Sequence, residues 1–204
     1  MDRAALKSAA KQQIRGKIGV LFIITLIIAI ISVGANLILG LIPVVGSIIA
    51  SFIITPAFTL SITRVYLNMI NGYEPSVGDA FSGFDDFWSA FKVNFLVGLF
   101  TFLWSLLLII PGFVKSFAYS MSIYILAENK GKAALECINE SKAITNGHKM
   151  ELFVLGLSFI GWILLVLVTF GIAAIWVAPY IQATMANAYR SLKPVQVNAE
   201  IEGE

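Results

Sequence analysis

The sequence has very little of the chemistry that most enzymes and disulfide-stabilised proteins use. It contains one cysteine, Cys137, and one histidine, His148, among 204 residues. A single cysteine excludes an internal disulfide framework, and a single histidine excludes multi-histidine metal sites and leaves any Ser/His/Asp triad dependent on one loop residue. A glycine-rich phosphate loop with a lysine is absent too. We therefore expect that the protein is not an enzyme and holds no cofactor or metal.

Charge is scarce as well. Only 13% of the residues are charged, 58% are hydrophobic, and the mean hydropathy is +0.87. These values lie outside the range of soluble domains, so lipid is the expected solvent for most of the chain. The net charge of +2 favours neither nucleic acid nor an acidic partner. We expect one membrane domain over residues 1–193, followed by a short polar tail, 194–204.

Six apolar runs predict membrane-spanning helices. They cover residues 18–41, 44–66, 94–110, 113–127, 152–169 and 171–189. Crossing a hydrocarbon layer takes about 20 helical residues, so the fourth run is the least secure span. Short turns with Pro43, Pro111-Gly112 or Gly171 separate the two runs of each pair. The predicted fold class is an all-α integral membrane protein with about six transmembrane helices arranged as three helical hairpins, plus amphipathic interfacial helices.

Lysine and arginine residues predict the orientation of these spans. They precede the first run, lie between the pairs and follow the last run, and only Lys115 lies near a turn within a pair. Basic residues near span ends are retained on the cytoplasmic side. We therefore expect a multi-pass protein of the cell (plasma) membrane with both termini cytoplasmic. Arg64 and Lys92 count here as ordinary residues that flank the segment after the second span.

Three polar segments have patterns of their own. Residues 2–17 form a predicted basic amphipathic helix that lies on the membrane or continues the first span. Residues 71–89 have aromatic spacing typical of a short interfacial helix, and residues 131–149 predict another surface helix. The middle segment also contains Asp79, Asp85 and Asp86. We interpret these carboxylates as a solvated face, because they lack a nearby histidine and a spacing suited to oxygen ligands.

A row of small hydroxyl residues at four-residue spacing follows the second span. It consists of Ser47, Ser51, Thr55, Thr59 and Thr63. Such a row allows close helix packing, with hydroxyls bonded to carbonyls of their own helix. The alternative is a polar pathway for a solute.

Prolines in the second and sixth spans add to the candidate positions. Each leaves a carbonyl of the preceding turn unpaired, which marks a kink or a place where irregular backbone faces a cavity. No catalytic, cofactor-binding or metal-binding residue is assigned. The candidate polar-row and kink positions are Ser51, Thr55, Pro56, Thr59, Pro179 and Gln182.

A faint internal repeat connects the same two spans. Tyr66 follows Pro56 by ten residues, and Tyr189 follows Pro179 by the same distance. This match favours a repeated hairpin.

Several short motifs resemble a known family. They include Arg3-Ala4-Ala5-Leu6-Lys7, Glu140-Ser141, Asn146-Gly147-His148-Lys149, Leu157-Ser158-Phe159-Ile160-Gly161-Trp162 and Ala178-Pro179-Tyr180. The chain resembles, over nearly its whole length, the bacterial integral membrane proteins of domain-of-unknown-function family 975. This resemblance implies a plasma-membrane protein of the Gram-positive type. It supplies no activity and no site residues.

Two functions fit these observations. The first is a non-enzymatic membrane protein that organises lipid or partner proteins through cytoplasmic surface helices. The alternative is a small permease or an export or resistance factor, with a polar path along the second span. The expected partners are membrane lipid and a second copy or another membrane protein, and not nucleic acid.

Overall fold

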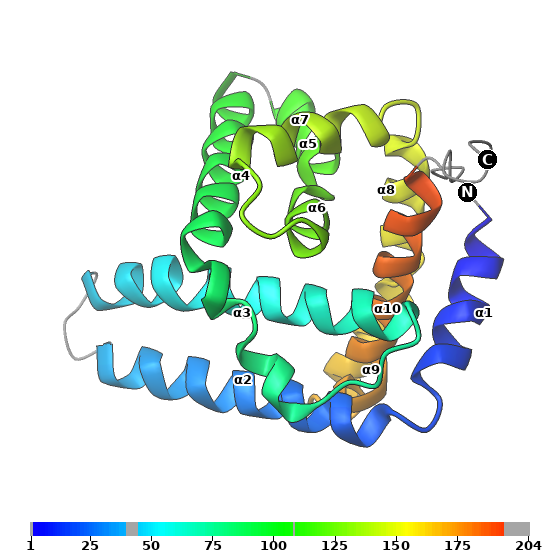
Figure 1. Cartoon of the computed structure of the whole chain (residues 1–204). Coiled ribbons are helices and arrows are strands. Elements are labelled where there is room, and N and C mark those ends of the chain that lie inside the picture. The colour runs from blue at the N-terminus through cyan, green and yellow to red at the C-terminus, as the bar shows by residue number, and fades with distance from the viewer. Residues whose placement is uncertain (1, 40–44, 108, 194–204) are drawn as a thin grey trace, which may run out of the picture.

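The computed structural model describes residues 2–39, 45–107 and 109–193, and every regular element in these ranges is a helix (Figure 1). The predicted tail, 194–204, and the turn at Pro43 lie outside the described residues. The elements are α1 (Arg3–Ile14), α2 (Ile18–Leu39), α3 (Val45–Ile70), the 3-10 helices η1 (Val77–Phe81) and η2 (Phe84–Asp86), α4 (Phe87–Leu107), α5 (Ile109–Tyr119), α6 (Ser122–Glu128), α7 (Ala134–Ile144), α8 (Lys149–Leu157), α9 (Ile160–Val168) and α10 (Ala174–Leu192).

Three helical stretches within the described ranges are long and apolar enough to cross a membrane. They are Ile18–Leu37, Val77–Leu106 and Lys149–Val168. Most of the side chains in each stretch are not buried by the rest of the protein. The structure therefore has an all-α fold with three candidate membrane-spanning helices, where the sequence predicted six spans.

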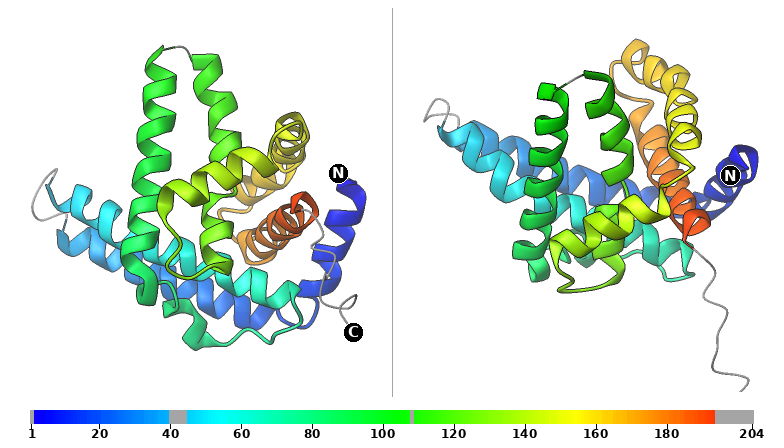
Figure 2. Two further views of the ribbon diagram at one scale, coloured as in Figure 1. Left: turned by 45° about the horizontal axis from the view of Figure 1, so that its top comes forward. Right: turned by 90° about the horizontal axis from the view of Figure 1, so that it is seen from above.

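Helices that follow one another pack in pairs around a shared centre. α2 packs along α3, α4 along α5, and α10 against α9. The α2 and α3 pair extends to the left of Figure 1 and the α4 and α5 pair toward its top, and Figure 2 shows the same divergence from two other directions. The buried core lies where the pairs meet, and it includes Leu60, Tyr66, Met121, Leu126 and Tyr189.

The far ends of these helices expose large apolar side chains. Leu37 near the end of α2 is 71% exposed, Leu106 of α4 is 73% exposed, and Phe170 after α9 is 98% exposed. Apolar area left in water costs roughly 25 cal/mol per Å². Exposed apolar surface on this scale indicates apolar surroundings for the far ends.

The predicted fourth span is interrupted. α5 ends at Tyr119 and α6 begins at Ser122, so residues 113–127 do not form one helix. The predicted turn at Pro111-Gly112 is also displaced, because both residues lie in the first turn of α5. Proline is tolerated there, since first-turn amides have no partner within the helix. A Cβ atom at Gly112 would lie 2.2 Å from Ser105 Oγ of α4, so the glycine permits the close approach of the two helices.

The predicted turn in the last apolar stretch is confirmed. α9 ends at Val168 and α10 begins at Ala174. Between them Phe170 has φ 49° and Gly171 has φ 90°, and the Gly171 amide donates to the Val166 carbonyl at 2.8 Å. A left-handed pair of this kind ends a helix, and glycine adopts it without strain.

The segment from 131 to 149 does form a helix, α7, but protein covers its apolar stripe. Cys137 and Ile138 are fully buried, and α7 packs against α4, α5 and α6. Burial raises the pKa of the Cys137 thiol to about 11. Ser141 Oγ donates to the Ala118 carbonyl at 2.7 Å and accepts from the Met121 amide at 3.2 Å. These bonds satisfy backbone groups at the break between α5 and α6.

Candidate functional site

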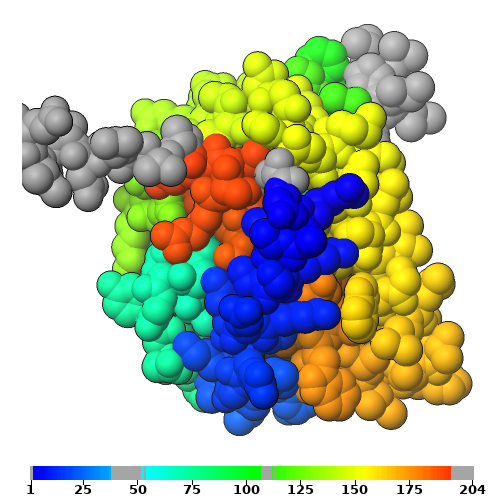
Figure 3. Space-filling model, turned by 90° about the vertical axis from the view of Figure 1, so that its right-hand side faces the viewer, coloured from blue at the N-terminus to red at the C-terminus, as the bar shows by residue number. Residues whose placement is uncertain are grey.

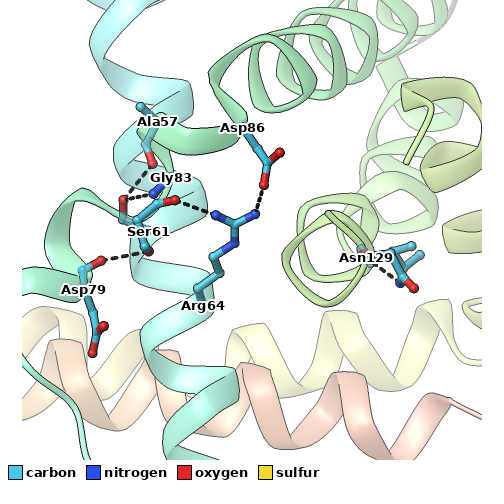
Figure 4. Close-up of polar contacts among 9 residues, drawn as sticks. Ala57, Ser61, Arg64, Asp79, Gly83, Asp86 and Asn129 are labelled. Carbon is cyan, nitrogen blue, oxygen red and sulfur yellow. Dashed lines mark hydrogen bonds and ion pairs between the residues drawn. The ribbon is translucent and has the colours of Figure 1, made fainter. Parts of the chain in front are cut away.

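A buried charge pair joins α3 to the segment before α4. The side chain of Arg64 on α3 is 6% exposed, and its guanidinium forms an ion pair with Asp86 of η2 and donates to the Ser82 carbonyl (Figure 4). Asp86 itself is 17% exposed. The prediction of a solvated face is therefore wrong for Asp86, because a buried guanidinium requires a counter-charge.

A second contact lies one turn earlier on α3. Ser61 Oγ donates to the Ala57 carbonyl at 3.1 Å and accepts from the Gly83 amide at 2.8 Å (Figure 4). A Cβ atom at Gly83 would lie 2.0 Å from the Ala57 carbonyl oxygen, so only glycine fits this approach. Asp79 caps η1 by accepting from the Ser76 amide at 2.8 Å. The predicted interfacial helix is thus replaced by two 3-10 helices held against α3.

We name the contacts of Ser61, Arg64, Gly83 and Asp86 the Arg64 junction. Among the buried side-chain nitrogen and oxygen atoms that the structure describes in this group, Nε of the Arg64 guanidinium is the one without a hydrogen-bond partner. The sequence pattern did not predict the junction, because Arg64 was interpreted as a charge that flanks the segment after the second span. The available signal was its position inside the apolar run 44–66, because a charge within such a run is generally paired.

Helix α1 lies along the outer face of α10, where Figure 3 shows it in blue beside the red end of α10. Leu6, Ala10 and Ile14 are buried in this contact. Gln13 and Asn187 of α10 add a reciprocal amide pair, with N to O distances of 3.2 and 2.6 Å. Because α10 packs against the apolar stripe, α1 does not lie on the membrane through this stripe, and Ile14 at its end also borders an open groove. Gly16, with φ 82°, also separates α1 from α2, so α1 does not continue the first span.

A row of positive charges at four-residue spacing runs along α1 directly beside this stripe, about 100° around the helix from it. The row is Arg3, Lys7, Lys11 and Arg15, and none of the four forms an ion pair with another described residue. Like charges four residues apart on a helix repel, at roughly 0.2–0.5 kcal/mol per pair. Burial, together with Arg3 and Lys11, lowers the pKa of the Lys7 ammonium from its usual 10.5. Among the residues that the structure describes, no carboxylate therefore forms an ion pair with this row.

Aromatic rings lie beneath two of these lysines. Lys7 Nζ is 5.0 Å from the centre of the Phe159 ring, and Lys11 Nζ is 5.8 Å from the centre of the Tyr180 ring. The rings of Phe159 and Tyr180 pack edge to face with their centres 5.9 Å apart, and the rings of Trp162 and Tyr180 have their centres 5.6 Å apart. Rings hold ammonium groups in place without neutralising them. We call Lys7, Lys11, Phe159, Trp162 and Tyr180 the lysine cradle.

The predicted polar row passes through different surroundings along α3. Thr55 is exposed and lines an open groove of about 320 Å³ between α3 and α4. Thr59 is half-buried, whereas Thr63 is buried and donates to the Thr59 carbonyl at 2.8 Å. The side chain of Ser51 lies outside the described part. The row thus leads from an open groove into the packed core.

The other predicted positions do not meet at one site. Pro56 is buried in α3 and borders the groove that Thr55 lines, whereas Pro179 of α10 borders a separate groove beside α2. Both helices continue past their prolines. Gln182 is half-buried on α10. The lysine cradle was not predicted from the sequence, and it is a more compact candidate site than the predicted polar-row and kink positions.

Comparison with known proteins gives a family and nothing finer. The family model described as "Protein of unknown function (DUF975)" matches residues 1–115 and 106–196, so the chain belongs to that family. No curated protein and no solved structure matches the chain.

Proposed function

We propose that this member of the family is a non-enzymatic, multi-pass membrane protein that organises lipid through its basic surface helix α1. The single observation that carries the proposal is the unbalanced row from Arg3 to Arg15, held by α10 on a molecule whose far ends expose apolar side chains. Anionic headgroups attract such a row with roughly 1 kcal/mol per basic residue near the membrane surface. The apolar helices cross the hydrocarbon layer, and their far ends reach its outer surface.

The proposed topology has six spans in three hairpins, with both termini cytoplasmic in the plasma membrane. Its support is the pairwise packing of α2 with α3, α4 with α5, and α9 with α10. The far ends that expose Leu37, Leu106 and Phe170 are apolar, whereas α1 carries the basic row and the last turn of α10 has Arg190. Basic residues near spans stay on the cytoplasmic side, so the row on α1 fits the inner leaflet.

Membrane lipid is the partner that the exposed apolar ends favour. A second copy of the chain or another membrane protein would bury the same side chains. Crosslinking in native membranes separates the two, because a stable partner gives one discrete larger band. Lipid alone gives the monomer.

A cysteine-accessibility map in intact cells tests the proposal. Cys137 is replaced by Ala, and single cysteines are placed at Leu37, Leu106, Phe170, Tyr73 and Lys130. The first three lie at the far ends, and all five side chains are exposed. A membrane-impermeant maleimide should label the three far-end positions and spare Tyr73 and Lys130 until the cells are opened. Labelling of Tyr73 and Lys130 in intact cells would overturn the orientation.

The alternative function, a small permease or export factor, rests on the groove at Thr55. Thr55 and Asn94 are the polar side chains among its lining residues, and the rest are mainly aromatic or aliphatic. This lining suits an acyl chain better than a hydrophilic solute. Uptake of a solute into proteoliposomes would be measured with and without Thr55→Val together with Thr59→Val. If these substitutions abolish the uptake, the result would favour the permease and would count against the lipid-organising function.

A further inference from the structure

Two hollows flank the lysines of α1. The first is an open basin of about 450 Å³ lined by Asp2, Arg3, Ala4, Lys7 and Ser158. The second is a groove of about 150 Å³ lined by Lys11, Ile14, Trp162, Trp176, Val177 and Tyr180. The basin is mostly basic at its rim, whereas the groove is apolar apart from the Lys11 ammonium and the Tyr180 hydroxyl. A polar hollow and an apolar hollow thus adjoin the same helix.

The lysine cradle connects the two hollows. Lys7 belongs to the basin and lies over Phe159, and Lys11 belongs to the groove and lies over Tyr180. Because Phe159 contacts Tyr180, the rings form one continuous floor beneath both ammonium groups. Residues four apart on a helix are neighbours, at about 5–6 Å between Cβ atoms. A single tetrahedral anion can therefore contact both lysines.

We infer that α1, α9 and α10 together form a binding site for one anionic phospholipid, with its phosphate between Lys7 and Lys11 and one acyl chain in the groove between Ile14 and Trp176. This inference rests on the proposed function and names the lipid class that α1 selects. The site is independent of the Arg64 junction, which lies on α3.

Charge complementarity supports a phosphate at this position. Lys7 donates to the Ser158 carbonyl at 3.5 Å, and neither lysine has a carboxylate partner among the described residues. Asp2 is the acidic group at the basin, and its Oδ1 atom already accepts from the Ala4 and Ala5 amides at 2.9 and 3.2 Å. A phosphate would add charge-assisted hydrogen bonds and relieve the repulsion within the row.

The groove distinguishes a lipid from a free phosphate ion. Trp162 is 38% exposed and Trp176 is 53% exposed at its rim, so apolar area remains open to an additional chain. Burial of each methylene contributes roughly 0.8 kcal/mol. Tryptophan is also enriched where hydrocarbon meets headgroups. A lipid uses both hollows, whereas inorganic phosphate uses the lysines alone.

Native mass spectrometry of the full chain in a neutral detergent tests the inference. The probes are phosphatidylglycerol, phosphatidylcholine with matched acyl chains, and inorganic phosphate. We expect one phosphatidylglycerol per chain, at least about tenfold tighter than phosphatidylcholine, which corresponds to about 1.4 kcal/mol. Inorganic phosphate at millimolar concentration should not displace it.

Variants then locate the bound lipid. Lys7→Gln together with Lys11→Gln should weaken phosphatidylglycerol binding at least about tenfold. Lys92→Gln together with Lys130→Gln removes the same charge from exposed positions elsewhere and should leave binding unchanged. Trp176→Ala should weaken binding without loss of charge, and Lys7→Arg together with Lys11→Arg should retain it. Each variant is first checked for a monodisperse elution peak.

Several results would overturn the site. Equal weakening by the two Lys→Gln pairs would mean that the protein attracts anionic lipid by general charge. Full displacement of the lipid by inorganic phosphate, or no effect of Trp176→Ala on binding, would mean that no acyl chain binds in the groove. The variant with Lys7→Gln and Lys11→Gln must also keep the labelling pattern of the cysteine-accessibility map. If that pattern holds while no lipid binds one to one, the site fails and the proposed membrane topology stands.

Discussion

Two stretches of the molecule share one pattern, the segment Pro56 to Tyr66 of α3 and the segment Pro179 to Tyr189 of α10. Both helices continue past the proline, and both tyrosines are buried. Five residues after each proline, Ser61 and Thr184 are fully buried and donate to the carbonyl four residues earlier, at 3.1 and 2.7 Å. The faint repeat in the sequence thus corresponds to a shared local environment.

The stretches differ in what they hold. Three residues after the buried hydroxyl, α3 has Arg64 and α10 has Asn187. Arg64 binds the carboxylate of Asp86, whereas Asn187 forms a neutral amide pair with Gln13 of α1. A buried guanidinium without its partner costs far more than an amide without its partner, which regains water easily at the surface. The same residue pattern therefore holds the segment before α4 with an ion pair on α3, and holds α1 with a pair of neutral amides on α10.

Replacement of Arg64 should produce the largest effect. Arg64→Leu leaves Asp86 without a counter-charge and should reduce the free energy of unfolding by about 3–5 kcal/mol. Asn187→Leu should cost only about 1–2 kcal/mol. Reversible unfolding in mixed micelles measures both. Arg64→Leu combined with Asp86→Leu should recover part of the loss, and equal losses for the two single variants would contradict the distinction between charged and neutral fastening.

Gly83→Ala should be the next most damaging change. The new methyl group would lie 2.0 Å from the Ala57 carbonyl oxygen and 2.8 Å from the Ser61 amide nitrogen, and neither backbone group can move aside. Overpacking of this kind costs about 3 kcal/mol. Gly98→Ala on α4 is the matched control, because nothing lies within 4 Å of its Cβ position. That control should be neutral or stabilising by up to about 1 kcal/mol.

The sequence predicts the helices far better than it predicts their contacts. The run 18–41 corresponds to α2, and the run 44–66 lies largely within α3, because hydropathy reports directly on apolar length. The run 113–127 does not form the predicted single helix. Ser141, about twenty residues later, instead forms hydrogen bonds with backbone groups at the break between α5 and α6. A contact between distant residues leaves no local pattern in the sequence.

The candidate sites show the same limit. The apolar stripe of α1 was predictable from its spacing, but α10 and lipid are equally apolar partners for it. The sequence does not distinguish Asp86 from other loop carboxylates, because its partner Arg64 comes from another element, α3. Lys7 and Lys11 were identified as basic, whereas the rings beneath them, Phe159 and Tyr180, lie in a distant part of the sequence. Pairing across such separations depends on the fold.

A smaller effect should distinguish the two buried hydroxyls. Ser61→Ala removes the acceptor of the Gly83 amide and leaves that buried donor unsatisfied, at about 1–2 kcal/mol. Thr184→Val keeps the side-chain shape and removes a bond within one helix, so it should cost under about 1 kcal/mol. Both are measured by the same unfolding assay. A larger loss for Thr184→Val would mean that α10 uses its hydroxyl for more than the bond to Tyr180.

Among the contacts between different elements, the smallest effect should be the coupling between Gln13 and Asn187. A double-mutant cycle with Gln13→Ala and Asn187→Ala should give about 0.5–1.5 kcal/mol, because the amide pair is only partly buried and water competes for it. Gln12→Ala, at an exposed position on the same helix, is the control and should not couple to Asn187. A coupling as large as that of Arg64 with Asp86 would place α1 among the fixed elements of the core. The neutral pair would then fasten its segment as firmly as the charged pair does.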